Sequence, residues 1–323
     1  MTGRAAAPIL RPINCPSTVT DQPDNVAPVA SIAYLSAPQK DLAAWLHYLS
    51  QTDIPILAET AVALEALRTK EDDVDASELA ALIDSDPLMT VKFMAYVATK
   101  RRTGDNTETE TVISSLVMTG VGPFFKNFGL QPTVQNQLHD QPLALQGLLA
   151  LLQRAKNAAH FAMAFAVHRG DTDAAVIHQA AYLHDFAEML MWCLAPTLAL
   201  EIQAMQLANP TLRSASLQRF VYNVELDDLR QALMTLWRLP GLLVRISDGK
   251  HPDHPSVRNV SLAVRLARHT EHGWENSAMP DDINDIAILL NAAPRVALAF
   301  LHKVALPVES GAGADDAPAE ATA

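Results

Sequence analysis

The sequence predicts an all-α protein with a multi-helix bundle and an N-terminal lobe of short helices. The 323 residues are 49% hydrophobic, so the chain can bury a large core. Aromatic residues make up only 6% of the chain and charged residues 19%, while Ala and Leu, which favour helices, recur throughout. Apolar residues often lie three or four positions apart, and neither alternating strand patterns nor Asn-Gly hairpin turns compete with this spacing.

Along the chain we expect four segments. Residues 1–37 are rich in Pro, Ser, Thr, Asp and Asn, which predicts a flexible leader. A first helical lobe should occupy residues 38–145 and a second helical lobe residues 146–305. Residues 306–323 carry Gly, Ala, Pro and acidic residues without an apolar face, which predicts a disordered acidic tail.

Helix start signals define the first lobe. Asp53-Ile54-Pro55 predicts the start of one helix, and Asp75 followed by Glu78 predicts a capped start for the next. Asp86 before Pro87 then predicts an N-cap followed by proline at the first helical position, where a missing N–H costs nothing. Two short helices should therefore meet at a corner near residue 85.

Helical spacing also defines the second lobe. It predicts helices over residues 148–167, from a cap near Asp171 or Thr172 to about Trp192, around 226–236, over 257–270, and over 283–304 with a break at Pro294. The helix that begins near Thr172 carries the pair His184-Asp185, and we place His184 on its inward face.

His184 and Asp185 form the strongest candidate for chemistry. Both are good metal ligands, but a hydrolytic metal site requires further His and Asp ligands from neighbouring helices. The alternative is a buried histidine that hydrogen-bonds to its neighbouring carboxylate, since an unpaired buried polar group is costly. On ligand count the second interpretation is favoured.

Other candidate residues have structural explanations. Asp227 and Asp228 are weaker candidates for remnant metal ligands, because acidic residues in the first turn of a helix are stabilised by the helix dipole alone. His251 and His254 lie in a proline-flanked loop without a third ligand. No Gly-rich phosphate loop, nucleophile elbow or Cys-His arrangement is found.

Four motifs in one order resemble the HDOD family, whose members are helical relatives of the HD metal-dependent phosphohydrolases. The resemblance covers about Asp53 to His254. The motifs are Ile54-Pro55-x-Leu57, then Glu78-Leu79-Ala80-x-Leu82-Ile83-x-Ser85-Asp86-Pro87-Leu88-x-Thr90-x-Lys92, then Ala181-x-Leu183-His184-Asp185, and Leu236-Trp237-x-Leu239-Pro240. We expect Pro55, Asp86, Pro87, Trp237 and Pro240 to be structural, with Trp237 anchoring a helix junction in the core.

The sequence departs from the HD phosphohydrolases at the positions that hold their metal. Where the preceding helix of such enzymes supplies a His, this chain has Arg154, Ala155 and Lys156, and Ala187-Glu188 replaces the Gly-Lys that follows the pair. The double His often present in HDOD relatives is missing near Asp248-Gly249-Lys250-His251. The resemblance therefore implies an HD-like fold with a degenerate metal site, in which the ligands left over are too few to activate a water.

The resemblance to the HDOD family implies a role in bacterial signal transduction. With the metal ligands missing, we expect a non-catalytic module that binds a signalling protein or a small ligand, with no cofactor and no bound metal. The alternative is a divergent HD metal-dependent phosphohydrolase that acts on a nucleotide or cyclic dinucleotide through His184 and Asp185 with Asp227 or Asp228.

The composition limits which partners and which cellular compartment we expect. The net charge of -12 and pI of about 5.3 disfavour nucleic acid. Cys15 and Cys193 cannot form a disulfide framework, and no signal peptide or membrane-spanning segment is predicted. We therefore expect a soluble, cytoplasmic protein without a membrane partner.

Overall fold

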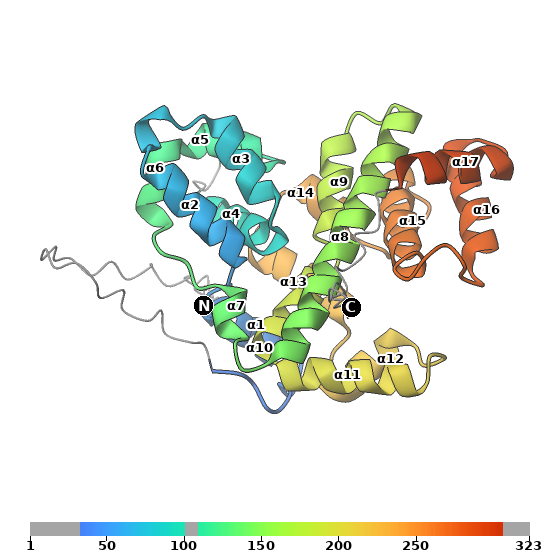
Figure 1. Ribbon diagram of the computed structural model, residues 1–323, viewed down its shortest axis with the longest axis horizontal. Helices are drawn as coiled ribbons and strands as arrows, with labels where there is room; N and C mark the ends of the chain where they lie inside the picture. The colour runs from blue at the N-terminus through green and yellow to red at the C-terminus, as the bar shows by residue number, and fades with distance from the viewer. Residues whose placement is uncertain (1–32, 101–108, 306–323) are drawn as a thin grey trace, which may run out of the picture.

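The prediction of an all-α protein is confirmed. The computed structural model describes residues 33–100 and 109–305, and within them the only β pairing is an isolated bridge between Ile56 and Thr133. Helices occupy most of this part of the chain (Figure 1). The predicted leader at residues 1–37 falls largely outside the described residues, and the predicted tail at 306–323 falls entirely outside them, as does Cys15.

The N-terminal lobe is a group of short helices at the left of Figure 1. In chain order these are α2 (Ala58–Arg68), the 3-10 helix η1 (Glu71–Asp73), α3 (Ala76–Asp84), α4 (Pro87–Lys100), α5 (Val112–Thr119) and α6 (Val121–Asn127). Their apolar faces enclose a core of their own, in which the rings of Phe124 and Phe128 stack with centroids 4.7 Å apart and Phe93 meets Phe124 edge-on at 5.5 Å. This aromatic cluster stabilises the lobe.

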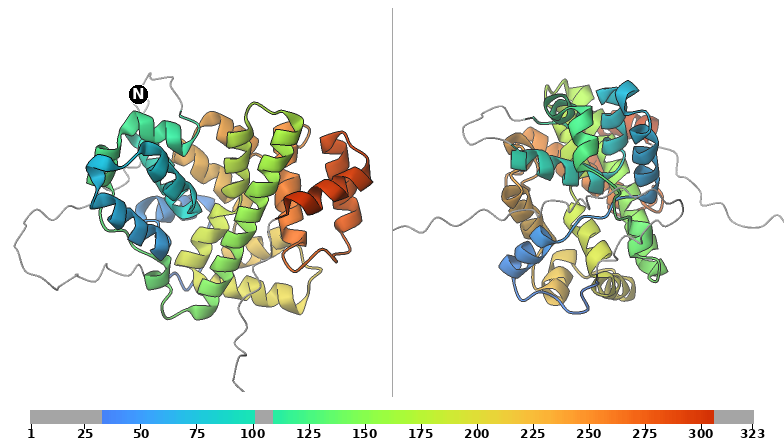
Figure 2. Two further views of the ribbon diagram at one scale, coloured as in Figure 1. Left: turned by 45° about the horizontal axis from the view of Figure 1, so that its top comes forward. Right: turned by 90° about the vertical axis from the view of Figure 1, so that its left-hand side faces the viewer.

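The C-terminal lobe surrounds one long helix. Its helices are α8 (Pro142–Arg169), α9 (Ala174–Tyr182), α10 (Phe186–Leu194), α11 (Pro196–Ala208), α12 (Ser214–Tyr222), α13 (Leu226–Leu236), α14 (Gly241–Ile246), α15 (Pro255–His269), α16 (Met279–Leu290) and α17 (Pro294–Val304). Figure 2 shows α8 running through the middle of the molecule, with the N-terminal lobe on one side and α15 to α17 on the other.

Two short helices from the N-terminal part of the chain complete this core. These are α1 (Leu42–Gln51) and α7 (Val134–Gln137). Trp45 of α1 is fully buried and donates a hydrogen bond of 2.8 Å to the carbonyl of Tyr222 at the end of α12. The C-terminal core therefore includes residues that precede the N-terminal lobe in the sequence.

The corner between α3 and α4 explains the motif residues of the first lobe. Asp86 is fully buried and caps α4 by accepting hydrogen bonds from the backbone amides of Leu88 (2.9 Å) and Met89 (3.2 Å), as its sequence context predicts. Its other carboxylate oxygen accepts from the amide of Leu57 at 2.7 Å. Asp86 thus ties the start of α4 to the segment that carries Pro55.

Lys92 makes a second connection between the same two segments. Its ammonium group donates to the Ile54 carbonyl at 2.9 Å and pairs with Asp53 at 2.7 Å. Burial lowers the pKa of Lys92, while the neighbouring Asp53 and Asp86 raise it. Asp86 and Lys92 therefore both hold the segment of residues 53–57 against α4.

The single helix predicted from about Thr172 to Trp192 is wrong. The structure has α9 and α10 instead, and residues 183–185 form tight turns between them. The helix is interrupted because the backbone carbonyl of His184 does not accept a hydrogen bond from an amide of the next helical turn. It accepts a hydrogen bond of 2.8 Å from the guanidinium of Arg230 instead. His184 and Asp185 therefore lie at a break between helices and not on a continuous helix face.

Other predicted boundaries agree more closely. The helix expected over 148–167 is α8, which begins earlier at Pro142, and the break expected at Pro294 separates α16 from α17. Trp237 ends α13, is 6% exposed, and packs against Phe186 with ring centroids 5.8 Å apart. Pro240 precedes α14 as its N-cap residue. The core role predicted for Trp237 is confirmed.

A helix that spans a bilayer needs about 20 consecutive, mostly apolar residues. Within the two described ranges, none of the helices has by itself both the length and the apolar composition of a membrane span. The pair α16 and α17 meets those criteria only when joined, and it is bent by 96°.

Candidate functional site

Asp185 is the centre of the site that the sequence indicated. It is 9% exposed and lies at the N-terminal end of α10. Its Oδ1 accepts a hydrogen bond of 2.7 Å from His184 Nδ1 and another of 2.8 Å from Arg268 on α15. Burial raises the pKa of the Asp185 carboxyl, but Arg268, His184 and Arg154 together hold it well below its usual range. The carboxylate is therefore ionised.

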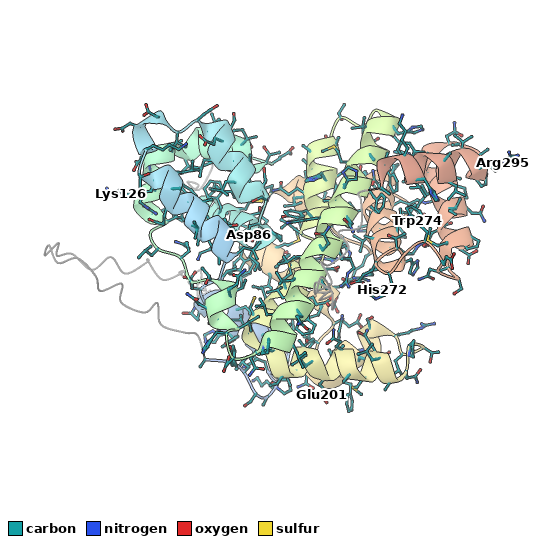
Figure 3. All side chains as sticks on the ribbon, in the orientation of Figure 1. Asp86, Lys126, Glu201, His272, Trp274 and Arg295 are labelled. Carbon is teal, nitrogen blue, oxygen red and sulfur yellow. The ribbon has the colours of Figure 1, made fainter. Side chains whose placement is uncertain are left out.

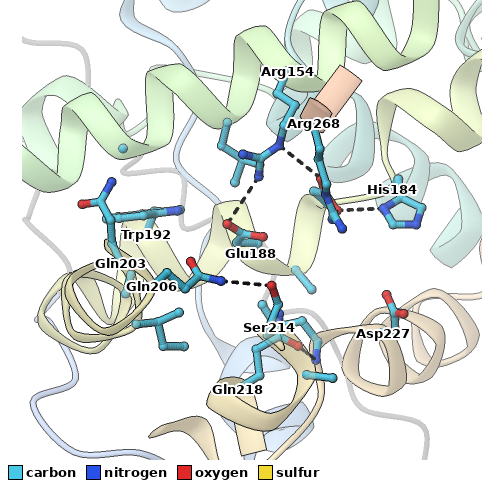
Figure 4. A pocket seen from close by; sticks show the side chains of 18 of the residues that line it. Arg154, His184, Glu188, Trp192, Gln203, Gln206, Ser214, Gln218, Asp227 and Arg268 are labelled. Atoms are coloured by element: carbon cyan, nitrogen blue, oxygen red, sulfur yellow. Dashed lines mark hydrogen bonds and ion pairs between the residues drawn. The ribbon is translucent and has the colours of Figure 1, made fainter. Parts of the chain in front are cut away.

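Arg154 of α8 lies among three carboxylates, and Figure 4 shows its contact with one of them, Glu188. Its guanidinium nitrogens are 3.9 Å from Asp185 Oδ2, 3.6 Å from Glu188 Oε1 and 3.3 Å from Glu271 Oε2. These separations are longer than the ~2.8 Å of a strong charge-assisted hydrogen bond. The Nε of Arg154 is buried and has no hydrogen-bond partner in the described part of the chain. Arg154 therefore contributes one positive charge among three carboxylates, and its hydrogen-bonding capacity is not fully used.

The pKa values of Glu188 and His184 are also shifted by their surroundings. Burial raises the pKa of Glu188, and the negative charge of Asp185 raises it further. Burial also lowers the pKa of His184, and the nearby Arg230 lowers it again, so the imidazole is neutral near pH 7. Because the ionised Asp185 can only accept, the single proton of the His184 ring lies on Nδ1.

Arg230 of α13 joins this site to the neighbouring helices. It is 3% exposed, and besides the carbonyl of His184 it contacts the carbonyl of Ser247 at 3.1 Å and Asp227 at 3.0 Å. The break between α9 and α10 is therefore held by a buried cation from a different helix.

Asp227 and Asp228 differ in their positions relative to the cavity and in their partners. Both lie in the first turn of α13, as predicted. Asp227 lines the same cavity as His184, whereas Asp228 pairs with Lys250 at 3.2 Å and does not line it. Of the two weaker candidates, only Asp227 is brought to the site, and there it is paired with Arg230.

A cavity of about 450 Å³ lies beside Asp185, between α8, α10, α13 and α15 on one side and α11 and α12 on the other. Figure 4 shows Arg154, Arg268 and Glu188 at one end of it and Gln203, Gln206, Ser214 and Gln218 toward the other. This volume lies within the range of ~300–1,000 Å³ that is common for small-molecule sites.

Gly147 and Trp192 form part of the wall of this cavity. A Cβ added at Gly147 would lie 2.6 Å from Cη2 of Trp192, so only glycine lets the indole pack this closely against α8.

The side chains around Asp185 do not fit a catalytic divalent ion. A guanidinium keeps its proton and has no lone pair to offer, so Arg154 and Arg268 repel a metal cation and do not bind it. Within residues 33–100 and 109–305, no three or more His, Cys, Asp and Glu side chains are grouped so that they could hold a metal ion. Arg154 and Arg268 supply the positive charge beside Asp185.

Comparison with protein-family models shows which family this chain belongs to. The HDOD domain model matches residues 54–252, more than half of the chain. The chain belongs to the HDOD family. Among curated proteins, none matches it significantly.

Solved structures confirm the HD-like helical fold of this HDOD protein. The MmoQ response regulator from Methylococcus capsulatus is 20% identical and gives a TM-score of 0.56, with 74% of this chain and 98% of the other covered. A virulence factor from Campylobacter jejuni is 17% identical and gives a TM-score of 0.59, with 82% and 96% covered. At these identities the likeness shows the fold alone.

Sequence reasoning missed Arg230 and Arg268. Each continues an apolar stripe: Arg230 follows Leu226 by four residues, and Arg268 follows Val264 by four. A charged residue at an otherwise apolar position of a helix predicts either an interruption of the apolar pattern or a buried ion pair. That signal was present for both arginines, but it does not identify their partners.

His251, His254 and His269 each have a local partner. His254 caps α15 by accepting from the Ser256 amide at 3.3 Å, and His251 lies 3.6 Å from Asp248. His269 contacts Asp282 at 2.5 Å, a partner that its place at a helix end does not predict.

Proposed function

We propose that this HDOD protein is a non-catalytic regulatory module that acts by binding a protein partner or a small ligand. The observation that carries the proposal is the contact of 2.8 Å between Arg268 and Asp185. In a metal hydrolase this carboxylate must be free to bind the ion that activates water. Here a fixed guanidinium neutralises it, and Arg154 adds a second cation on the other side.

A regulatory role is supported by the family and by the retained framework. The HDOD model matches the chain, and one protein of similar fold is described as a response regulator. The helical framework and its capping residues are intact, while the centre of the HD-like lobe carries arginines. A fold that keeps its architecture but has cations in place of metal ligands is suited to binding, since fold alone does not determine function.

The alternative is a divergent HD phosphohydrolase. The position of Asp227 on the same cavity as His184 is the observation that favours it. Its carboxylate, however, is paired with Arg230 at 3.0 Å, so it also has a cation as its partner.

Phosphoester hydrolysis separates the two functions. The wild-type protein and an Asp185→Asn variant are incubated with p-nitrophenyl phosphate and bis(p-nitrophenyl) phosphate in the presence of Mn²⁺, Mg²⁺ or Ni²⁺. The proposal predicts equal, background release of p-nitrophenol from both proteins. Release by the wild type that the Asp185→Asn variant abolishes would support the hydrolase instead.

A further inference from the structure

A second cavity lies between the two lobes, away from Asp185. Its volume is about 350 Å³. Asp84 and Ser85 line it from the end of α3 in the N-terminal lobe, and its other walls come from α8 and α9 in the C-terminal lobe. In Figure 1 these elements face one another across the middle of the molecule, so a ligand here would contact both lobes.

Opposite charges border this cavity without meeting each other. Asp84 comes from the N-terminal lobe and Lys156 from α8, and both residues are exposed. In the described part of the chain, neither takes part in an ion pair or a side-chain hydrogen bond. The cavity therefore offers one carboxylate and one ammonium group that have no partner.

Asp84 carries its negative charge at neutral pH. Desolvation by the surrounding protein raises the pKa of its carboxyl to about 6, which is still below pH 7. A cation placed beside it would stabilise the ionised form and lower this pKa again. The position of the carboxyl thus favours a positively charged partner.

Uncharged polar groups also line the cavity. Tyr182 is 4% exposed, and its hydroxyl makes no hydrogen bond to any other residue of 33–100 and 109–305. A hydroxyl in such a place must find its partner in the cavity, from water or from a ligand. The ring of His178 stacks on Tyr182 with centroids 6.1 Å apart and also borders the cavity.

His160 also lines the cavity. Its Nε2 lies 2.6 Å from the carbonyl of Val304 and donates to it. Burial lowers the pKa of the facing His178, and the nearby His160 lowers it further, which keeps His178 uncharged. Asp84 and Lys156 are the Asp, Glu, Lys and Arg side chains among the lining residues, and their formal charges cancel.

We propose that this cavity binds a small zwitterion of amino-acid size, with its ammonium group toward Asp84 and the Tyr182 hydroxyl and its carboxylate toward Lys156. A ligand with both charges completes two ion pairs, whereas a singly charged ligand completes one and leaves the other group unpaired. The cavity volume suits a molecule of this size.

This inference deepens the proposed function, because it names a class of small ligand and a place where that ligand would tie the lobes together. It does not depend on the charge state of Asp185. Ligand titration measures binding, and the hydrolysis assay measures catalysis, so either proposal can fail without the other.

The test uses the standard L-amino acids singly as probes, with thermal unfolding of the full chain as the first measurement and calorimetry for any that stabilise it. The expected result is that at least one amino acid binds. Two analogues of that amino acid are then compared with it: one lacks the carboxylate and the other lacks the amino group. Each should bind at least about tenfold more weakly than the amino acid, as loss of one charged hydrogen bond implies.

Variants locate the binding. Tyr182→Phe removes only the hydroxyl and should weaken binding about fivefold, while Lys156→Gln should weaken it about tenfold. Lys126→Gln, at an exposed lysine of the N-terminal lobe that is labelled in Figure 3, is the matched control and should bind like the wild type.

Three outcomes would overturn the proposal. The first is that no amino acid binds, and the second is that a singly charged analogue binds as tightly as the amino acid. The third is binding that is unchanged in both Tyr182→Phe and Lys156→Gln, each first shown to unfold cooperatively like the wild type.

Discussion

Arg268 of α15 donates a hydrogen bond of 2.8 Å to Oδ1 of Asp185, the carboxylate of the His-Asp pair. The same oxygen accepts from His184, so the carboxylate is engaged by two donors from within the protein. Together with Arg154, these contacts form a network of ion pairs between α8, α15 and the start of α10.

Replacing Arg268 should destabilise the protein. An Arg268→Met variant keeps much of the aliphatic packing but removes the main cation beside the buried Asp185. Because the Arg268 side chain is 44% exposed, we expect a loss of only about 1–2 kcal/mol in the free energy of unfolding. Urea denaturation at pH 7 measures it.

Arg258→Met on the same helix is the matched control, since Arg258 makes no side-chain contact of this kind in the described residues. Equal losses in the two variants would show that the pairing with Asp185 contributes nothing specific.

Asp185 should make stability depend on pH in a defined direction. Its pKa is lower in the folded protein than in the unfolded chain, so the folded state gains stability from the ionised form. That contribution is complete above about pH 4 and is lost as the pH falls toward the lower folded pKa. The free energy of unfolding of the wild type should therefore exceed that of Asp185→Asn at pH 7, and the difference should shrink below about pH 4. A difference that grows with acidity would contradict the assigned direction.

Asp86 should contribute more stability than an ordinary helix cap. Asp86→Ala leaves the buried amide of Leu57 without its acceptor and removes the cap of α4, so we expect a loss of about 2–4 kcal/mol. Asp75→Ala removes an exposed cap of α3 that accepts only from the Ser77 amide, and it should cost about 1 kcal/mol. Chemical denaturation of both variants gives the comparison, and similar losses would show that the contact with Leu57 is unimportant.

Gly147 should tolerate no side chain. In Gly147→Ala the new Cβ meets the Trp192 ring at 2.6 Å, and the resulting displacement should outweigh the ~1 kcal/mol by which alanine favours a helix. We expect a net loss of about 1 kcal/mol or more in thermal or urea unfolding. Gly129→Ala, where a Cβ would meet nothing within 4 Å, should leave stability nearly unchanged. A stabilised Gly147→Ala variant would show that Trp192 has room to move.

Sequence patterns among neighbouring residues predict the helices and their caps. The arrangement of the site around Asp185 depends on contacts between residues far apart in the sequence. The cap at Asp86, the break at Pro294 and the core position of Trp237 follow from neighbouring residues, and the structure confirms all three. The break between α9 and α10 was missed because its cause, Arg230, lies 46 residues from His184.

Arg268 was missed for the same reason, since it lies 83 residues from Asp185. Arg154 was noticed at the position of a missing histidine, but only the structure shows that its charge is shared among three carboxylates. Helix periodicity cannot show which charged residues from separate helices meet.

The most direct test of the central claim is the metal content of untagged protein purified without chelator, measured by elemental analysis beside a folded His184→Ala, Asp185→Ala double variant. If Arg268 and Arg154 have taken the place of a metal, both proteins should contain far less than one ion per chain. One or two ions per chain in the wild type that are lost in the double variant would contradict the account.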